Sequence, residues 1–78
     1  MSEESRRWVL YEEGAYYKIY KLLAQESFYN HVKITKIYDG KGCTYSFRHS
    51  VKRKHYTNLT LENLNRILSN FRLPRLEE

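Results

Sequence analysis

Apolar and polar residues alternate through much of the N-terminal two thirds of the chain, which is the pattern of half-buried β-strands. The alternation is clearest in residues 28–38 and 43–49, and a short β-prone run occupies residues 8–11. Residues 15–23 fit both a strand and a helix, although their three tyrosines and one isoleucine favour the strand. The pattern therefore predicts four strands.

Two glycines are expected to help join these strands. Gly14 can form a turn because glycine accepts a positive φ. Asp39 and Gly40 favour a tight hairpin of type I′, which needs a positive φ at both central residues. In the strand that follows, alternation places three residues on one face and three on the other: Cys43, Tyr45 and Phe47 against Thr44, Ser46 and Arg48.

The C-terminal third contains one helical pattern. Thr60 is a suitable N-cap, Glu62 suits the positive end of the helix dipole, and Pro74 is expected to stop the helix. Residues 50–56, just before this helix, are polar and basic and are predicted to be a loop. Five apolar residues form one stripe at helical spacing, expected to face the core or a dimer partner: Leu61, Leu64, Ile67, Leu68 and Phe71.

These elements predict an α+β fold, a four-stranded antiparallel β-meander followed by one C-terminal amphipathic α-helix. Residues 1–78 are expected to form a single domain, with flexible tails at residues 1–6 and 75–78. A chain this short buries only roughly 60–65% of its unfolded surface, so its core alone leaves it marginally stable. Small scaffolds often gain stability from a partner subunit, and we therefore expect a homodimer.

The single cysteine and the lack of long apolar runs indicate where the protein works. Cys43 cannot form an intrachain disulfide, which favours a reducing compartment and an intracellular location, in the cytoplasm or the nucleus. The acidic N-terminus does not resemble a signal peptide. No apolar run approaches the roughly 20 residues that cross a bilayer, so no membrane partner is expected.

The charge distribution and the tyrosine content of the chain bear on its function. The chain has a net charge of +5, yet residues 14–76 contain twelve lysines and arginines and only three acids. All eight tyrosines lie between Tyr11 and Tyr56, interleaved with these cations. Cations attract phosphates, and unpaired bases stack on aromatic rings. This combination fits a surface that binds single-stranded nucleic acid, and it fits equally a solvated basic surface with tyrosines half-buried in a sheet.

Catalysis and metal binding find little support in the sequence. Ser46, His49 and Cys43 are close in sequence, but side chains two apart on a strand do not reach hydrogen-bonding distance. The spacing of Cys43, His49 and His55 is not that of a zinc motif, and no glycine-rich phosphate loop is present. We therefore expect a non-enzymatic protein with no cofactor and no metal.

The basic hairpin is the candidate binding site. Lys33, Arg48 and Lys36 are expected to lie within reach of a nucleic-acid backbone, and Tyr38 and Tyr45 are candidates for base stacking. The alternative for Tyr45 is a place in the core beneath the helix. Three further cations are expected to extend the positive surface as a flexible arm, or to form an exposed loop with no partner: Lys52, Arg53 and Lys54.

Three segments in this order resemble the positive-cofactor-four family of transcriptional coactivators and its bacterial relatives. They are the strand and basic turn of residues 31–41, the strand end of residues 45–48, and the Thr-Leu helix opening of residues 58–62. The resemblance spans about residues 28–72 and implies a symmetric dimer, paired partly through the helices, that binds single-stranded DNA. It implies that Arg48 and Lys41 contact phosphates and that the aromatic residue before the turn, Tyr38, stacks on bases.

The sequence thus predicts a homodimeric, non-enzymatic protein that binds single-stranded DNA, or RNA, as an accessory factor in transcription or replication. A protein partner from the transcription or replication machinery fits the same role. The alternative is a small viral or mobile-element protein that binds and inhibits a host nucleic-acid-processing protein. Tyrosine and arginine are enriched at protein interfaces, so the composition suits that function too.

Overall fold

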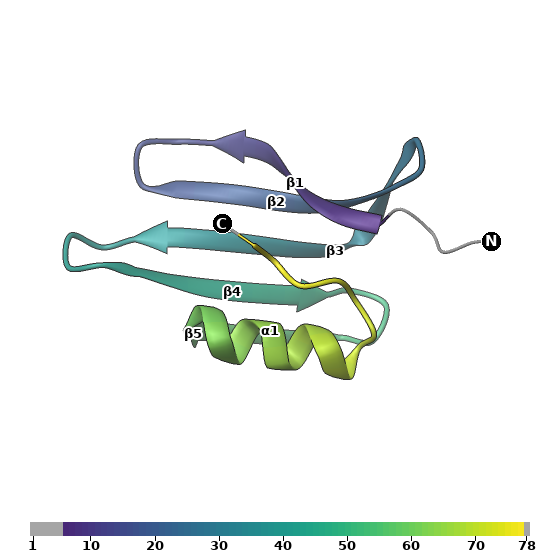
Figure 1. Ribbon diagram of the computed structural model, residues 1–78. Helices are drawn as coiled ribbons and strands as arrows, with labels where there is room; N and C mark the ends of the chain where they lie inside the picture. The colour runs from purple at the N-terminus through teal and green to yellow at the C-terminus, as the bar shows by residue number, and fades with distance from the viewer. Residues whose placement is uncertain (1–5, 78) are drawn as a thin grey trace.

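The computed structural model, which describes residues 6–77, is an antiparallel sheet with one helix packed on one face (Figure 1). The five strands lie in chain order in the sheet, so the fold is a meander and the predicted α+β class is confirmed. Residues 1–5 and 78, which include parts of both predicted tails, lie outside the described range. The elements are β1 Arg6–Glu13, β2 Tyr17–Ala24, β3 Ser27–Tyr38, β4 Cys43–His49, β5 Lys54–Leu59 and α1 Leu61–Asn70.

The strand count is one higher than predicted. The segment of residues 15–23 forms the favoured strand from residue 17 onward, as part of β2, but the predicted loop of residues 50–56 runs into a fifth strand. In β5, Tyr56 lies opposite Phe47 and Leu59 lies opposite Tyr45, with a register shift between them. β5 has one more residue than β4 between these two pairs, and Asn58, with a φ of 56°, lies in this bulge. This bulge separates the two inward-facing residues by three positions, which hides the period-two signal in the sequence.

The turns also differ from the prediction in detail. Only Gly40 has a positive φ in the β3–β4 connection, at 88°, so the turn is not type I′. Instead the Asp39 carboxylate accepts hydrogen bonds from the backbone N–H groups of Lys41 and Gly42, both at 3.1 Å. At the β1–β2 turn, Gly14 does not supply a positive φ; the ring of Tyr17 occupies the space that a Cβ atom would need.

The hydrophobic core lies between α1 and the sheet face beneath it. Phe47 in β4 is fully buried and packs against the rings of Tyr56 and Phe71, with centroid distances of 6.5 and 5.6 Å. The predicted apolar stripe of α1 faces this core: Leu64 and Leu68 are fully buried, and Leu61, Ile67 and Phe71 pack against them. The remaining buried apolar residues are Leu22, Val32, Ile34, Tyr45 and Leu76.

The segment after α1 turns back and crosses the sheet on the helix side (Figure 1). Residues 75–78 were expected in a flexible tail, yet Leu76 is buried in the core. The Asn65 side chain holds the backbone of Leu76 from both sides, accepting from its N–H at 2.8 Å and donating to its C=O at 3.3 Å. The Trp8 indole donates to the Pro74 carbonyl at 2.8 Å. A single leucine between charged residues forms no periodic apolar pattern, so the burial of Leu76 could not be predicted from the sequence.

The predicted N-cap of α1 is confirmed, and it provides a stability test. The Thr60 hydroxyl accepts a hydrogen bond from the Asn63 N–H at 3.1 Å. Thr60→Ala is expected to lower the free energy of unfolding by about 1 kcal/mol and the Tm by about 4–8 °C, since the N–H loses its partner. Ser69→Ala, at an exposed helical site, is the control and should not destabilise the fold. Equal thermal unfolding curves for wild type and Thr60→Ala would contradict this role.

Candidate nucleic-acid interface

The sheet face opposite α1, called the open face below, carries a row of basic residues that crosses four neighbouring strands, with a lysine or arginine on three of them. Lys21 in β2 lies opposite Lys33 in β3, and Lys33 lies opposite Arg48 in β4. Arg48 in turn lies opposite His55 in β5. Side chains that face each other across antiparallel strands point to the same side of the sheet. We call Lys21, Lys33, Arg48 and His55 the cation row.

No acid interrupts the cation row. The next residue across the sheet is Val9 in β1, opposite Lys21. Like charges directly opposite each other on neighbouring strands destabilise a sheet, and an anion bound across them would relieve the repulsion. The acid described at the β1 edge of this face is Glu12, whose carboxylate accepts a hydrogen bond from the Tyr17 hydroxyl at 2.8 Å. That bond raises the pKa of Tyr17.

Two shallow hollows follow the cation row. One, of about 230 Å³, is lined by Lys21, Lys33 and Arg48 together with polar residues of the β3 bulge. The other, of about 350 Å³, continues from Arg48 to the β4–β5 turn, where Arg53 and Lys54 join its lining. Neither lining contains an acid. The open face therefore carries lysine and arginine side chains on β2, β3 and β4, with no acid in either hollow.

Two exposed aromatic rings lie beside the cation row. Tyr11 in β1 and Phe28 in β3 meet edge to face with ring centroids 5.6 Å apart, and they are 53% and 40% exposed. The Lys21 ammonium sits 4.2 Å from the Tyr11 ring centroid. A phosphate held at Lys21 would thus leave the adjoining base within reach of an aromatic surface.

Not all of the predicted hairpin residues share this face. Lys33 and Arg48 do, as expected, but Lys36 and Tyr38 lie on the helix side, because their positions alternate in step with buried Val32. The Lys36 ammonium lies 5.2 Å from the Tyr38 ring centroid. Tyr45 is only 5% exposed and belongs to the core, which is the alternative that the sequence left open; stacking by Tyr45 is ruled out in this fold.

The other predicted cations fall into two places. Lys41 is exposed at the tip of the β3–β4 hairpin, away from the cation row. Lys52 and Arg53 form an ordered turn rather than a flexible arm, since their backbone N–H groups donate to His49 Nδ1 and to the Ser50 carbonyl, both at 3.3 Å. Lys54 begins β5. Of these, Arg53 lines the hollow beside Arg48, whereas Lys54 lies opposite buried His49 and therefore points to the helix side. The Lys52 ammonium lies 5.7 Å from the ring of Phe71.

Four residues of the open face were missed by sequence reasoning: Lys21, His55, Tyr11 and Phe28. Lys21 lay in the segment that fitted both a strand and a helix, and His55 lay in a predicted loop. The register of the paired strands places these four residues on one face, and a single sequence does not reveal that register where bulges interrupt the pairing.

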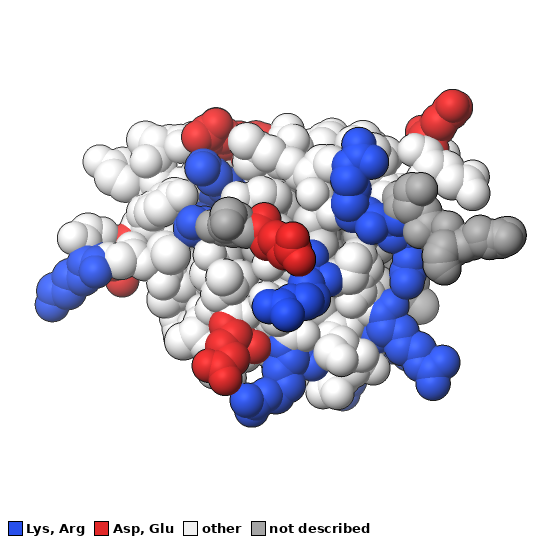
Figure 2. Space-filling view, viewed as in Figure 1, with Lys and Arg blue, Asp and Glu red and all other residues white. Residues whose placement is uncertain are grey.

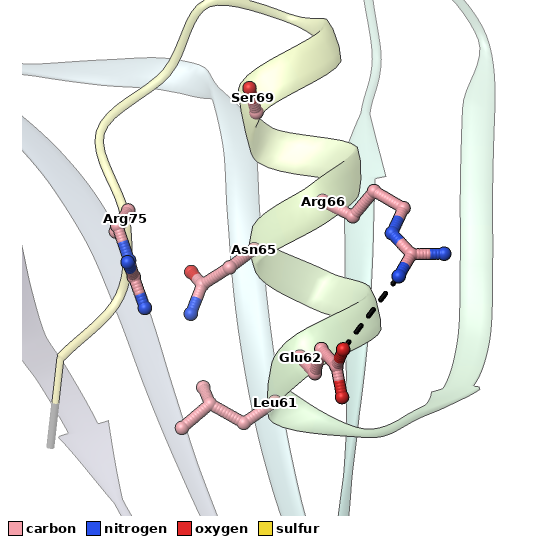
Figure 3. A pocket seen from close by; sticks show the side chains of 6 residues that line it. All are labelled: Leu61, Glu62, Asn65, Arg66, Ser69 and Arg75. Atoms are coloured by element: carbon pink, nitrogen blue, oxygen red, sulfur yellow. Dashed lines mark ion pairs between the residues drawn. The ribbon is translucent and has the colours of Figure 1, made fainter.

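The helix side differs in charge from the open face. Figure 2, viewed from the side of α1, shows acidic and basic side chains interspersed over the surface. A hollow of about 580 Å³ beside α1 includes Arg75 and Arg66 in its lining, but Arg66 turns to Glu62, with a nitrogen–oxygen distance of 3.7 Å (Figure 3). An exposed pair of this kind offsets the cation, so this hollow has a weaker pull on phosphate.

His49 is a buried titratable group at the end of β4. Its ring lies 5.3 Å from the rings of His31 and Phe71, and its Nδ1 accepts the Lys52 N–H, which fixes the neutral tautomer with the proton on Nε2. Burial lowers the pKa of His49, and the nearby His31 and Lys52 lower it further. The folded chain therefore favours an uncharged His49.

This lowered pKa predicts a pH-dependent stability. Above pH 6.5, the ordinary histidine pKa that applies to the unfolded chain, His49 is neutral in both states and the fold has its full stability. As the pH falls from there through the lower pKa of the folded chain, the unfolded chain takes up a proton more readily, so the free energy of unfolding decreases. The free energy of unfolding, measured with urea between about pH 5 and pH 7.5, should therefore decrease toward acid. His49→Gln should flatten this dependence, and His55→Gln, at an exposed site, should not. Equal slopes for wild type and His49→Gln would contradict the assignment.

Residues 6–77 contain no group of three or more His, Cys, Asp or Glu side chains placed to hold a metal ion. In the same range, α1 is too short and too polar to cross a membrane. Comparison with protein-family models, curated proteins and solved structures finds no match to this chain. The candidate interface therefore rests on the geometry of the sheet alone.

Proposed function

We propose that the chain is a non-enzymatic protein that binds single-stranded nucleic acid across the open face of its sheet. The observation that carries the proposal is the cation row, in which Lys21, Lys33 and Arg48 are immediate cross-strand neighbours with no acid among them. A binding role in transcription or replication agrees with the resemblance noted in the sequence.

Spacing and accessibility favour an extended single strand. Neighbouring strands lie about 4.8 Å apart, so the four members of the cation row span roughly 15 Å across the sheet. A flexible strand can lay several phosphates along such a row. Tyr11 and Phe28 are exposed beside it, and only unpaired bases can stack on them. A duplex would gain the phosphate contacts and lose the stacking.

Fluorescence anisotropy with purified, nuclease-treated protein tests the proposal. The probes are labelled oligo-dT, oligo-U of the same length, an abasic oligomer with the same phosphates, and duplex DNA. We expect the base-bearing single strands to bind most tightly, with a salt slope of about −2 if Lys21, Lys33 and Arg48 each neutralise one phosphate. The abasic oligomer should bind about tenfold or more weakly, since each stacked base contributes roughly 1–3 kcal/mol.

Two results would contradict the proposal. Equal affinities for all four probes, lost together as salt rises, would mean that the charge is not organised for single strands. No binding to any probe at low salt would also overturn it. Either result would direct the search to a protein partner, which is the alternative function predicted from the sequence.

A further inference from the structure

The outer edge of β1 is an open sheet edge. β1 is first in the strand order and pairs with β2, and no strand among residues 6–77 pairs with its other side. Leu10 and Tyr11 are both exposed in this strand. A free edge eight residues long is a template for another strand, and most proteins protect such edges.

β1 carries opposite charges at its two ends. Arg6 and Arg7 begin the strand, Glu12 and Glu13 end it, and residues 8–11 between them are apolar or aromatic. Arg7, Glu12 and Glu13 are exposed. Like charges along an edge would repel a second copy, whereas this arrangement attracts one that runs antiparallel, because each end then meets its opposite.

The β-bulge of β1 selects one register for such a pair. Residues opposite each other across antiparallel strands must point to the same face. Arg7 and Val9 point to the open face, and the register shift between Leu10 and Glu12 turns Glu12 to that face as well. A twofold axis at Val9 therefore places Arg7 opposite Glu12 of the partner subunit, with their side chains on the same face.

The same register also opposes compatible side chains on the helix side of the sheet. It places Arg6 opposite Glu13 of the partner subunit, both on the side covered by the helix, and Trp8 opposite Leu10 of the partner subunit. Every directly opposed pair is then of opposite charge or apolar, apart from the bulged Tyr11. A register shifted by one residue would turn opposed side chains to different faces.

We infer that this chain forms a symmetric dimer in which β1 pairs antiparallel with β1 of a second copy, with the twofold axis at Val9. Val9 is the residue next to Lys21 across the sheet, so the axis joins the cation rows of two subunits end to end. The inference rests on β1 alone, and the dimer can be tested without nucleic acid. Its failure would leave the binding proposal for one subunit unaffected.

Sedimentation velocity of the full chain, free of nucleic acid, is the first test. We expect a dimer for the wild type, weakened about tenfold or more by Arg7→Glu or by Glu12→Arg, since each replaces two attractions per dimer by repulsions. The double variant Arg7→Glu with Glu12→Arg should restore the dimer. Circular dichroism of each variant confirms folding. A wild-type monomer, an open-ended filament, or a dimer indifferent to all three variants would overturn the inference.

Disulfide trapping tests the register in a Cys43→Ser background. Opposed Cα atoms at Val9 would lie about 4.5–5.5 Å apart, within the range that a disulfide spans. Val9→Cys should therefore form a covalent dimer on mild oxidation, and Tyr11→Cys, the matched exposed control, should do so far more slowly. Faster trapping at Tyr11→Cys, or none at Val9→Cys, would contradict a twofold axis at Val9.

Discussion

Replacing Lys33 and Arg48 together by glutamate is expected to lower the affinity for oligo-dT by at least about a hundredfold. The two side chains are cross-strand neighbours at the centre of the cation row. Removing attractions of roughly 1.4 kcal/mol at each site already weakens binding a hundredfold, and the new carboxylates add repulsion. The salt slope should fall by about 1.4, since each lost phosphate contact removes about 0.7. Anisotropy titrations at several salt concentrations measure both quantities.

The matched control is the double variant Arg66→Glu with Arg75→Glu. It makes the same change in net charge on the helix side, where both residues are exposed. We expect it to weaken binding far less, because it alters only the long-range field, which salt screens. Equal losses in the two double variants would show that net charge, rather than the cation row, determines the affinity.

Phe47→Ala is expected to have the largest effect on stability. Phe47 is fully buried and its ring contacts aromatic rings from both β5 and the end of α1, at Tyr56 and Phe71. Truncating a buried phenylalanine costs about 3–5 kcal/mol, which is a large part of the stability of so small a domain. The Tm should fall by about 15 °C or more, or no cooperative transition should remain.

Thermal unfolding followed by circular dichroism measures this loss. Val51→Ala is the control, since Val51 is 71% exposed in the β4–β5 turn and its truncation should change the free energy of unfolding by less than about 0.5 kcal/mol. A Phe47→Ala variant that melts within a few degrees of the wild type would mean that Phe47 does not lie at the centre of the core.

Local signals explain what the sequence predicted about the fold. Thr60 and the apolar stripe predicted α1 correctly, because an N-cap and a 3.6-residue apolar period can both be recognised within a short stretch of sequence. The alternation of apolar and polar residues likewise predicted that Lys33 and Arg48, on the two strands of one hairpin, share a face of the sheet. The fifth strand was hidden because Asn58 breaks its alternation with a left-handed residue. Leu76 was hidden because its burial depends on Asn65, eleven positions earlier.

The candidate site was harder to predict than the fold, because it depends on register across several strands. Tyr38 and Lys36 were predicted to bind nucleic acid as a basic-aromatic pair. However, both lie an even number of positions from buried Val32 in β3, so they point to the helix side. Lys21 and His55 become neighbours of the hairpin cations only after two bulged pairings are set. Long-range pairing of this kind is decided by tertiary packing and leaves little trace in any short window of sequence.

The most direct test of the central claim is an NMR titration of the isotope-labelled chain with oligo-dT. Backbone amide signals report which face of the sheet meets the nucleic acid. We expect the largest shift changes at Lys21, Lys33 and Arg48 and near Tyr11, with small changes along α1. Shift changes concentrated on α1 and the C-terminal segment, or none at saturating oligo-dT, would contradict binding by the open face.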